Sequence, residues 1–392
     1  MKTQILNQKN SGSMTRSNSL FAKRILNVIL SAAVIITVAL FSSCQKEDPD
    51  KDSIVPERFK VEIPKSISSN TSKKTAQVDT ISGNDIYEHL RNFINLGEGA
   101  AELTENVMLM IALNNLNRPL ELTIVSDSDG RQKHISIIEN VTFESKTYQY
   151  RMTVTDIDDV PAKMYSDYTT NIALQVFWNL APIDGISILN SYNIDRNTDE
   201  KFMNTYYRVE YSETGSLGYD QHMVVTVTGI PLPPANEHIF GVSTVKMFAG
   251  KKGDIVSIYG NTEHPNAQFF TEQTGFNWAF VAAGSKSLDI AVAEVGLPPV
   301  TLDSDDRYTL LEEYSIYNVF RNQILLTWPT INPEVLDAYL YHAQAPGYFN
   351  QYGFVQGGEA PNSAYAPLEE LIEALVPYNP THIGALDVRF QE

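Results

Sequence analysis

An aromatic-rich segment near the end of the chain has the composition of a ligand-binding surface. Between positions 339 and 365, Tyr and Phe alternate with Gly, Pro, Gln and Asn, and a Trp precedes this segment. Flat rings bury the apolar faces of a sugar or a peptide, while amide side chains hydrogen-bond its polar groups. The predicted ligand-binding residues are Trp328, Tyr341, Tyr348, Phe349 and Tyr352. The alternative is that these rings fill the core or clamp the loop.

The motifs of familiar catalytic sites are missing from the sequence. There is no Gly-x-Ser-x-Gly elbow, no His-Glu-x-x-His motif and no phosphate loop that ends in Gly-Lys-Ser/Thr. A glycosidase needs only two carboxylates that meet in space, and the 47 acidic residues leave this reaction open. We therefore predict a non-enzymatic protein without catalytic residues or a cofactor. A hydrolase of surface polymers is the least favoured alternative.

Three acidic loops contain oxygen ligands of the kind that calcium prefers. They lie at positions 127–129, 156–159 and 303–306. None has the twelve-residue loop that ends in Glu, and Asp is also a favoured turn residue. The His residues are scattered, and His238 and His264 are the nearest to a loop pair. We therefore expect ordinary turns and no metal site.

The only cysteine of the 392-residue chain follows a basic and then an apolar N-terminal segment. The first 43 residues contain five Lys or Arg and no acidic residue, and an apolar run extends from Ile25 to Leu40. This order is typical of a secretory signal peptide. The run is shorter than the roughly 20 residues that span a bilayer, which disfavours a permanent transmembrane helix.

Positions 40–44, Leu-Phe-Ser-Ser-Cys, resemble the lipobox of Gram-negative bacterial lipoproteins. Phe41 departs from the aliphatic residue that is usual in this family. The resemblance implies that residues 1–43 are removed and that the sulfur of Cys44 carries lipid. Each buried acyl methylene contributes about 0.8 kcal/mol, so several chains such as palmitate would anchor the protein firmly. The alternative is a secreted protein with an accidental cysteine.

An acidic cluster at positions 45–52 directly follows Cys44. It is similar to the export signal that carries some of these lipoproteins through the outer membrane to face the exterior. The alternative is a solvated tether without a sorting role. We predict a lipid-anchored protein of the outer membrane, exposed at the cell surface.

The charge balance excludes one class of partner. The chain has 29 Lys and Arg against 47 Asp and Glu, a net charge of -18. Removal of the leader would leave 24 cations and all 47 acidic residues. Nucleic acid binding requires clustered cations, so no nucleic acid partner is expected. Anionic headgroups would not attract this chain either, and membrane attachment would depend on the lipid anchor.

Composition and periodicity divide the remaining chain. Residues 44–82 are polar and contain three Pro, which predicts the lipidated Cys followed by a flexible acidic and polar stalk. We expect the folded region to comprise residues 83–392. It begins with a predicted helix pair, in which Gly97 ends the first helix and the second extends from 98 to about 115.

Short β-rich runs separated by Asp, Asn and Gly predict ten or more antiparallel strands after position 120. Positions 127–130 and 250–253 carry hairpin turn signals. The last two predicted strands occupy 324–328 and 386–390. Further helices are predicted to begin at Pro333 and Pro367.

A sheet this broad must curl, split or close. We predict a mainly β fold with flanking helices (α+β), in which a large curved antiparallel sheet, like a half-barrel, packs on helices. Such half-barrels resemble the carrier fold of lipid-transfer lipoproteins, which implies an apolar ligand. The alternative is two β-sandwich domains that divide near 231–234.

These features favour a membrane-anchored, non-enzymatic surface lipoprotein that binds a ligand. The ligand would be a lipid if the half-barrel is hollow, a glycan if the aromatic surface is flat, or another protein. The alternative function is a structural or adhesive subunit of a surface appendage or envelope complex. Such a subunit would assemble through exposed strand edges.

Replacing the single cysteine tests the anchor. We expect Cys44→Ala to abolish incorporation of radiolabelled palmitate and to release the protein from membranes, because no other thiol can carry the acyl chains. Ser43→Ala, which keeps a small residue beside the cysteine, should incorporate palmitate normally. Membrane association of the Cys44→Ala variant would contradict the prediction.

Overall fold

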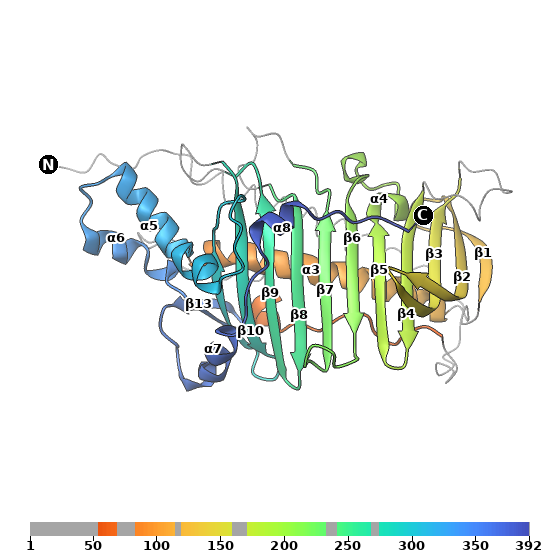
Figure 1. Cartoon of the computed structure of the whole chain (residues 1–392), viewed down its shortest axis with the longest axis horizontal. Coiled ribbons are helices and arrows are strands. Elements are labelled where there is room, and N and C mark those ends of the chain that lie inside the picture. The colour runs from red at the N-terminus through yellow and green to blue at the C-terminus, as the bar shows by residue number, and fades with distance from the viewer. Residues whose placement is uncertain are drawn as a thin grey trace.

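The computed structural model describes residues 54–68, 83–113, 119–158, 171–232, 241–267 and 274–391, and its strands form one antiparallel sheet (Figure 1). Each of the 13 strands pairs with its neighbours in chain order, and the sheet is open, with β1 and β13 at its edges. The strands are β1 (Leu120–Val125), β2 (Gln132–Phe143), β3 (Lys146–Asp156), β4 (Ile172–Leu180), β5 (Ile183–Asn190), β6 (Tyr206–Ser212), β7 (Gln221–Thr228), β8 (Thr244–Lys252), β9 (Ile255–His264), β10 (Phe276–Ser285), β11 (Ile290–Gly296), β12 (Gly347–Asn350) and β13 (Gly353–Gly357).

This architecture confirms the predicted mainly β fold with flanking helices. The two-sandwich alternative is not formed, because β7 and β8 pair directly across positions 231–234, from Gln221↔Lys251 to Val227↔Val245. Both predicted hairpin turns are present between paired strands. Gly130 and Gly253 adopt left-handed φ values of 70° and 58° there, which glycine tolerates without a steric penalty.

A single long helix, α3 (Gly83–Leu113), covers one face of the sheet (Figure 1). Leu90, Ile94 and Leu103 of this helix are buried in the main core together with apolar side chains of the strands. Within the part of the chain that the structure describes, no helix is both long and apolar enough to cross a membrane, and this includes α3.

The predicted helix pair is wrong, because α3 continues through Gly97. A Cβ atom at this position would lie 2.4 Å from the Cε atom of Met247 on β8. Gly97 therefore allows the helix to lie close to the sheet. A glycine at a close packing contact has the same signature in the sequence as a glycine that ends a helix.

Residues 54–68 correct the predicted stalk, because they belong to the folded body. Phe59, Val61 and Ile67 are completely buried. The Phe59 ring lies 5.6 Å from the ring of Tyr211, and the indole nitrogen of Trp178 donates to the carbonyl of Ile54 at 2.6 Å. The segment ends in the short helix α2 (Lys65–Ser68). Polar residues separate the apolar residues of this segment, so its average composition is that of a linker although its apolar side chains are buried.

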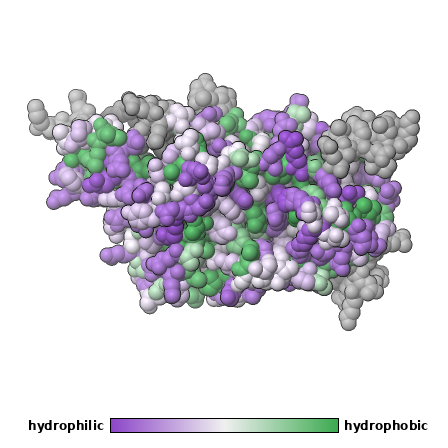
Figure 2. Space-filling model, in the orientation of Figure 1, coloured by the Kyte–Doolittle hydropathy of each residue, from purple (hydrophilic) through white to green (hydrophobic). Residues whose placement is uncertain are grey.

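Shorter elements lie on the opposite face of the sheet, which we call the outer face, and at the ends of the sheet. They are α4 (Ser191–Ile194), η3 (Glu200–Phe202), the π-helical η4 (Thr309–Glu313), α5 (Ile316–Thr327), α6 (Pro333–Tyr339), η5 (Tyr341–Ala343), η6 (Ser363–Tyr365), α7 (Ala366–Ile372) and α8 (Pro380–Gly384) (Figure 1). At the ends of the sheet, α4, η3, α5, α6 and η5 contribute side chains to the main core. The two predicted helix starts are confirmed, and Asn332 caps α6 by accepting a hydrogen bond from the amide of Glu334. Hydrophilic side chains cover much of the outer face (Figure 2).

The two predicted terminal strands are wrong. Residues 324–328 belong to α5 and its C-cap, and Ser315 caps the start of this helix by accepting from the amide of Asn318. A short continuous apolar run does not distinguish strand from helix. Residues 386–390 form no strand and instead lie along the outer face, where Val388 and Phe390 pack with Phe177 and Tyr206.

Truncation of a buried ring tests whether residues 54–68 belong to the fold. We expect Phe59→Ala to lower the free energy of unfolding by about 3–5 kcal/mol, because the change leaves a cavity between α3 and the sheet. The neighbouring Arg58 side chain is 50% exposed, and Arg58→Ala should change stability by less than about 0.5 kcal/mol. Urea unfolding of both variants would measure the difference. Equal stability would place this segment outside the cooperative unit.

Candidate functional site

The hairpin of β2 and β3 ends in a strained turn. Its two central residues, Glu144 and Ser145, adopt left-handed φ values of 47° and 67°. Two-residue hairpin turns of this kind usually contain Asn and Gly, because other side chains cost about 1–2 kcal/mol each in this conformation. Backbone strain of this kind is concentrated at functional sites, which makes the turn a candidate.

A bend in β2 carries this turn over the outer face. Asn140 has a φ of 56°, and the strand pairing passes there from Glu139↔Tyr150 to Val141↔Tyr148. The register is the same on both sides of this position, so no residue is inserted, and the left-handed backbone of Asn140 changes the direction of the strand. The tip then packs on β4, where the ring of Phe143 stacks on the ring of Phe177 with centroids 4.3 Å apart.

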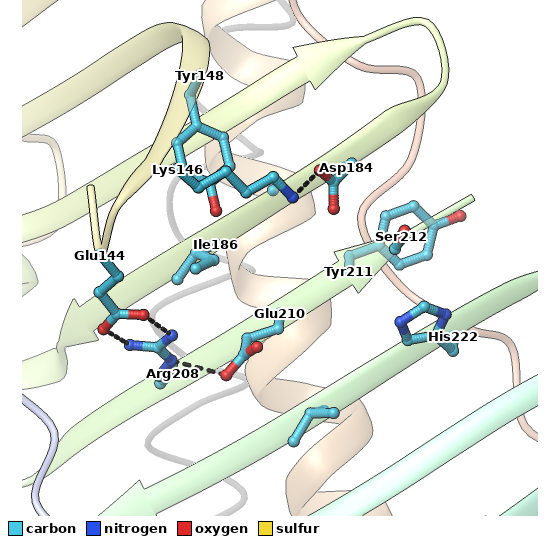
Figure 3. A pocket seen from close by; sticks show the side chains of 12 residues that line it. Glu144, Lys146, Tyr148, Asp184, Ile186, Arg208, Glu210, Tyr211, Ser212 and His222 are labelled. Carbon is cyan, nitrogen blue, oxygen red and sulfur yellow. Dashed lines mark hydrogen bonds and ion pairs between the residues drawn. The ribbon is translucent and has the colours of Figure 1, made fainter. Parts of the chain in front are cut away.

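Between this tip and strands β5, β6 and β7 lies a shallow hollow of about 240 Å³, which we call the outer groove (Figure 3). Successive side chains of a strand point to opposite faces, so β6 directs Tyr207 and Val209 to the main core, while Arg208 and Glu210 line the groove. The groove is lined by Glu144, Lys146, Tyr148, Asp184, Gly185, Ile186, Arg208, Glu210, Tyr211, Ser212, His222 and Val224.

Ion pairs join the hairpin tip to the strands below it. Both nitrogens at the end of the Arg208 guanidinium donate to the Glu144 carboxylate, at 2.6 and 2.7 Å, and its Nε donates to Glu210 at 2.9 Å. Lys146 on the tip pairs with Asp184 on β5 (Figure 3). The charges of the groove are therefore largely balanced within it.

The protonation states follow from these contacts. The hydrogen bonds from Arg208 hold the pKa of Glu144 below its usual range. Burial alone would lower the pKa of Arg208, but its bonds to the two carboxylates raise it. A glycosidase general acid needs a raised pKa, so the environment of Glu144 does not suit that role.

Two further groups offer polar contacts without charge. Burial, supported by the nearby Asp184, raises the pKa of Tyr148 to about 12, so its hydroxyl keeps its proton at neutral pH. Burial lowers the pKa of His222, which keeps its ring neutral at pH 7. The buried Nδ1 atom of His222 has no hydrogen-bond partner among the described residues. The groove thus combines charged oxygens and nitrogens, a hydroxyl and a neutral imidazole around the aliphatic side chains of Ile186 and Val224.

The five predicted ligand-binding residues do not form one surface. Tyr348 and Phe349 are both buried and face opposite sides of β12. The Tyr348 hydroxyl donates to Glu369 on α7, whereas the Phe349 ring lies 5.2 Å from the ring of Tyr87 on α3. In this structure neither ring is accessible to a ligand.

The other three predicted residues are exposed. Trp328 follows α5, Tyr341 begins η5 and Tyr352 lies in the turn between β12 and β13. Figure 2 shows hydrophobic residues gathered over the projecting helices α5 and α6, close to which Trp328 lies. The binding role of these three residues stays a prediction. Cys44 and His238 lie outside the described residues.

Arg and Lys side chains of the same chain pair with the carboxylates of the first two acidic loops. Asp156 is completely buried and accepts hydrogen bonds from Arg131 at 2.9 Å and Arg196 at 2.6 Å, while Lys133 donates to Asp129 at 2.9 Å. Burial alone would raise the pKa of Asp156, but these bonds hold it below its usual value. In the third loop, Asp303 accepts from the side chain of Asn379. Across the described ranges, no group of three or more His, Cys, Asp or Glu is placed to hold a metal ion.

Comparison of the chain with protein-family models, with curated proteins and with solved structures gives no match. The chemistry of the outer groove therefore has to be interpreted from its own residues. One feature of the sequence indicated the polar surface of the groove, namely the alternation of charged and apolar residues along β6. Nothing in the sequence indicated that the tip of a distant hairpin would fold over this strand.

Removal of the central cation tests the electrostatics of the groove. We expect Arg208→Gln to raise the pKa of Glu144 toward its usual value, because the hydrogen bonds that lower it are lost. Because the pKa of Glu144 is lower in the folded than in the unfolded protein, its ionised carboxylate stabilises the fold at pH values above the unfolded-state pKa. This stabilisation is lost as the pH falls through the folded-state pKa. The variant should lack that acid dependence.

An NMR titration of the Glu144 carboxyl carbon would measure this pKa. Lys201→Gln is a suitable control, since Lys201 of η3 pairs with the N-cap residue Asp199 and not with Glu144. An unchanged Glu144 pKa in Arg208→Gln would contradict the assigned cause.

Proposed function

We propose that this protein is a non-enzymatic lipoprotein of the bacterial outer membrane, anchored through Cys44, and that its outer groove binds one sugar ring of a surface or extracellular glycan. The observation that carries the proposal is the outer groove itself, in which a strained turn places Glu144 and Lys146 above a polar strand surface. The anchor and the exposure at the cell surface rest on the N-terminal sequence alone.

A neutral polyhydroxylated ligand suits the balanced charge of the groove. Lys146 and Arg208 face three carboxylates, and each of the five charged groups already has an ion-pair partner. A strongly charged ligand would have to compete with these pairs. Sugar hydroxyls can instead donate to the carboxylates and accept from the cations and from the Tyr148 hydroxyl, without adding a net charge.

The size of the groove favours a single ring. Its volume of about 240 Å³ lies below the roughly 300–1,000 Å³ that is usual for small-molecule sites. The remainder of a glycan could extend along the open outer face. The His222 ring lines the groove, and its buried Nδ1 atom, which has no hydrogen-bond partner among the described residues, would reach a sugar hydroxyl if the ring turned toward the groove.

An apolar ligand has less support. A carrier would hold lipid between the sheet and its helices, but α3 fills that space with buried side chains that include Phe93, Ile94 and Leu103. A closely packed interface of this kind leaves no room for an acyl chain unless the helix moves away from the sheet. The carrier version would require such an opening.

Glycan-array binding by the full chain in detergent tests the proposed ligand class. Once a binding glycan is found, Lys146→Ala and His222→Ala should each weaken its binding about 3- to 10-fold, because each loses about one hydrogen bond. Lys201→Ala is a matched control: its side chain is 52% exposed against 48% for Lys146, and each lysine has one ion-pair partner. The control should bind normally.

Two outcomes would overturn the proposed ligand class. One is the absence of binding across arrays that include bacterial and host glycans. The other is a binding glycan whose affinity is unaffected by both groove variants. Lipid extracted in stoichiometric amount from the purified protein, beyond the acyl chains of the anchor, would favour the carrier version instead.

A further inference from the structure

One edge of the sheet has no described neighbour. β1 pairs with β2 along its whole length, from Leu120↔Ile137 to Val125↔Gln132, and no other described strand lies on its far side. Half of the backbone donors and acceptors of such an edge strand point away from the sheet. Ile124 and Val125 are 43% and 62% exposed, although both are β-branched and apolar.

The two edges of the sheet differ in regularity. β13 has five residues, begins and ends with glycine, and joins β12 through an irregular register between Tyr348 and Phe349. Bulged, short edges resist pairing with another chain. β1 has six residues in unbroken register, contains no Pro and carries a single charge, Glu121. β1 is therefore the edge that is suited to strand addition.

We propose that two copies of this chain dimerise by antiparallel pairing of β1 with β1, across a two-fold axis at Thr123. The strand sequence, Leu-Glu-Leu-Thr-Ile-Val, complements itself in this register. Leu122 faces Ile124 of the second copy, and this apolar pair occurs twice. Thr123 faces its own counterpart, a cross-strand pair that is favourable in sheets.

The charge pattern selects this register over a neighbouring one. With the axis at Thr123, Glu121 faces Val125 of the second copy. An axis at Glu121 would place the two glutamates opposite each other, and like charges directly opposite are destabilising. Leu122 also packs against the main core, so a neighbouring Ile124 would extend that core across the dimer.

The proposed pairing forms a closed dimer that does not extend to further copies. A contact between β1 and β1 uses the same surface in both copies, so no β1 edge remains for a third copy. The two-fold axis is perpendicular to the sheet, and both outer faces therefore point the same way. The outer groove is formed over β5, β6 and β7, away from β1, and stays open in the dimer.

Charge substitutions at one position test the register. Sedimentation velocity of the full chain in detergent should show a concentration-dependent monomer–dimer equilibrium. Val125→Glu should raise the dimer dissociation constant at least about tenfold, because two glutamates then face each other at both ends of the pairing. Val125→Lys should leave dimerisation intact or strengthen it, since the lysine would face Glu121.

Three further variants separate dimerisation from folding. Ile124→Lys should also weaken the dimer at least about tenfold, whereas Leu288→Lys, at a 60% exposed residue in the turn before β11, should not. Adding Glu121→Lys to Val125→Glu should restore dimerisation by reversing the charge pair. All five variants should have the same circular dichroism spectrum as the unsubstituted chain.

Cysteine cross-linking provides a second measurement. A chain with Cys44→Ser contains no thiol, so Thr123→Cys in this background introduces only one. Residues directly opposite in antiparallel strands lie about 4.5–5.5 Å apart at Cα, within the range of a disulfide. Mild oxidation should give a covalent dimer, while Leu288→Cys in the same background should stay monomeric.

A monomer at all concentrations up to about 100 μM would overturn the proposal, as would equal effects of Val125→Glu and Val125→Lys. Failure of Thr123→Cys to cross-link more than Leu288→Cys would also overturn it. None of these outcomes bears on glycan binding, which is measured separately with the groove variants.

Discussion

The packing of α3 on one face of the sheet is the contact on which the remaining structure depends. The 13 strands form an open antiparallel sheet that does not close into a barrel. The apolar face of such a sheet has to be buried against another element. α3 supplies that cover along its length, with residues 54–68 completing the same core. Gly97 allows the helix to approach Met247, and a larger residue would have to displace that side chain. Because this face is filled, the proposed binding site lies on the opposite one.

The outer face is covered only in part, and by segments from distant parts of the chain. The bent hairpin tip covers β4 and β5, and the C-terminal segment packs beside it: the side chain of Gln175 exchanges two hydrogen bonds with the backbone of Gln391. Phe143, Phe177 and Val388 belong to a small separate core there. This core offsets the strain of the turn at Glu144 and Ser145. The outer groove is the part of the face that these segments leave open.

Buried carboxylates of this protein pair with nearby Arg and Lys side chains, although the chain has a large excess of acidic residues. The buried carboxylate of Asp156 pairs with Arg131, Lys133 and Arg196. Two of the three loops that resemble calcium sites are therefore satisfied by Arg and Lys of the same chain, because Lys133 also pairs with Asp129. The groove follows the same rule, with Arg208 shared by two glutamates. Such pairs specify one arrangement of segments more than they add stability, because each requires the desolvation of both partners.

The sequence by itself determined strands β1 to β11, the hairpin turns and the helix starts at Pro333 and Pro367, because these depend on alternation, turn residues and caps within a few positions. The short strands β12 and β13, which are rich in glycine, were not predicted. It did not determine the continuity of α3, the burial of residues 54–68 or the helical state of 324–328. Each of these depends on which distant surface a segment meets. The aromatic segment shows the same limit, since Tyr348 and Phe349 are adjacent in sequence but occupy different cores. Only the tertiary structure assembled the outer groove, because its residues come from β3, β5, β6, β7 and the hairpin turn, and no local pattern records which strands a bent tip will cover.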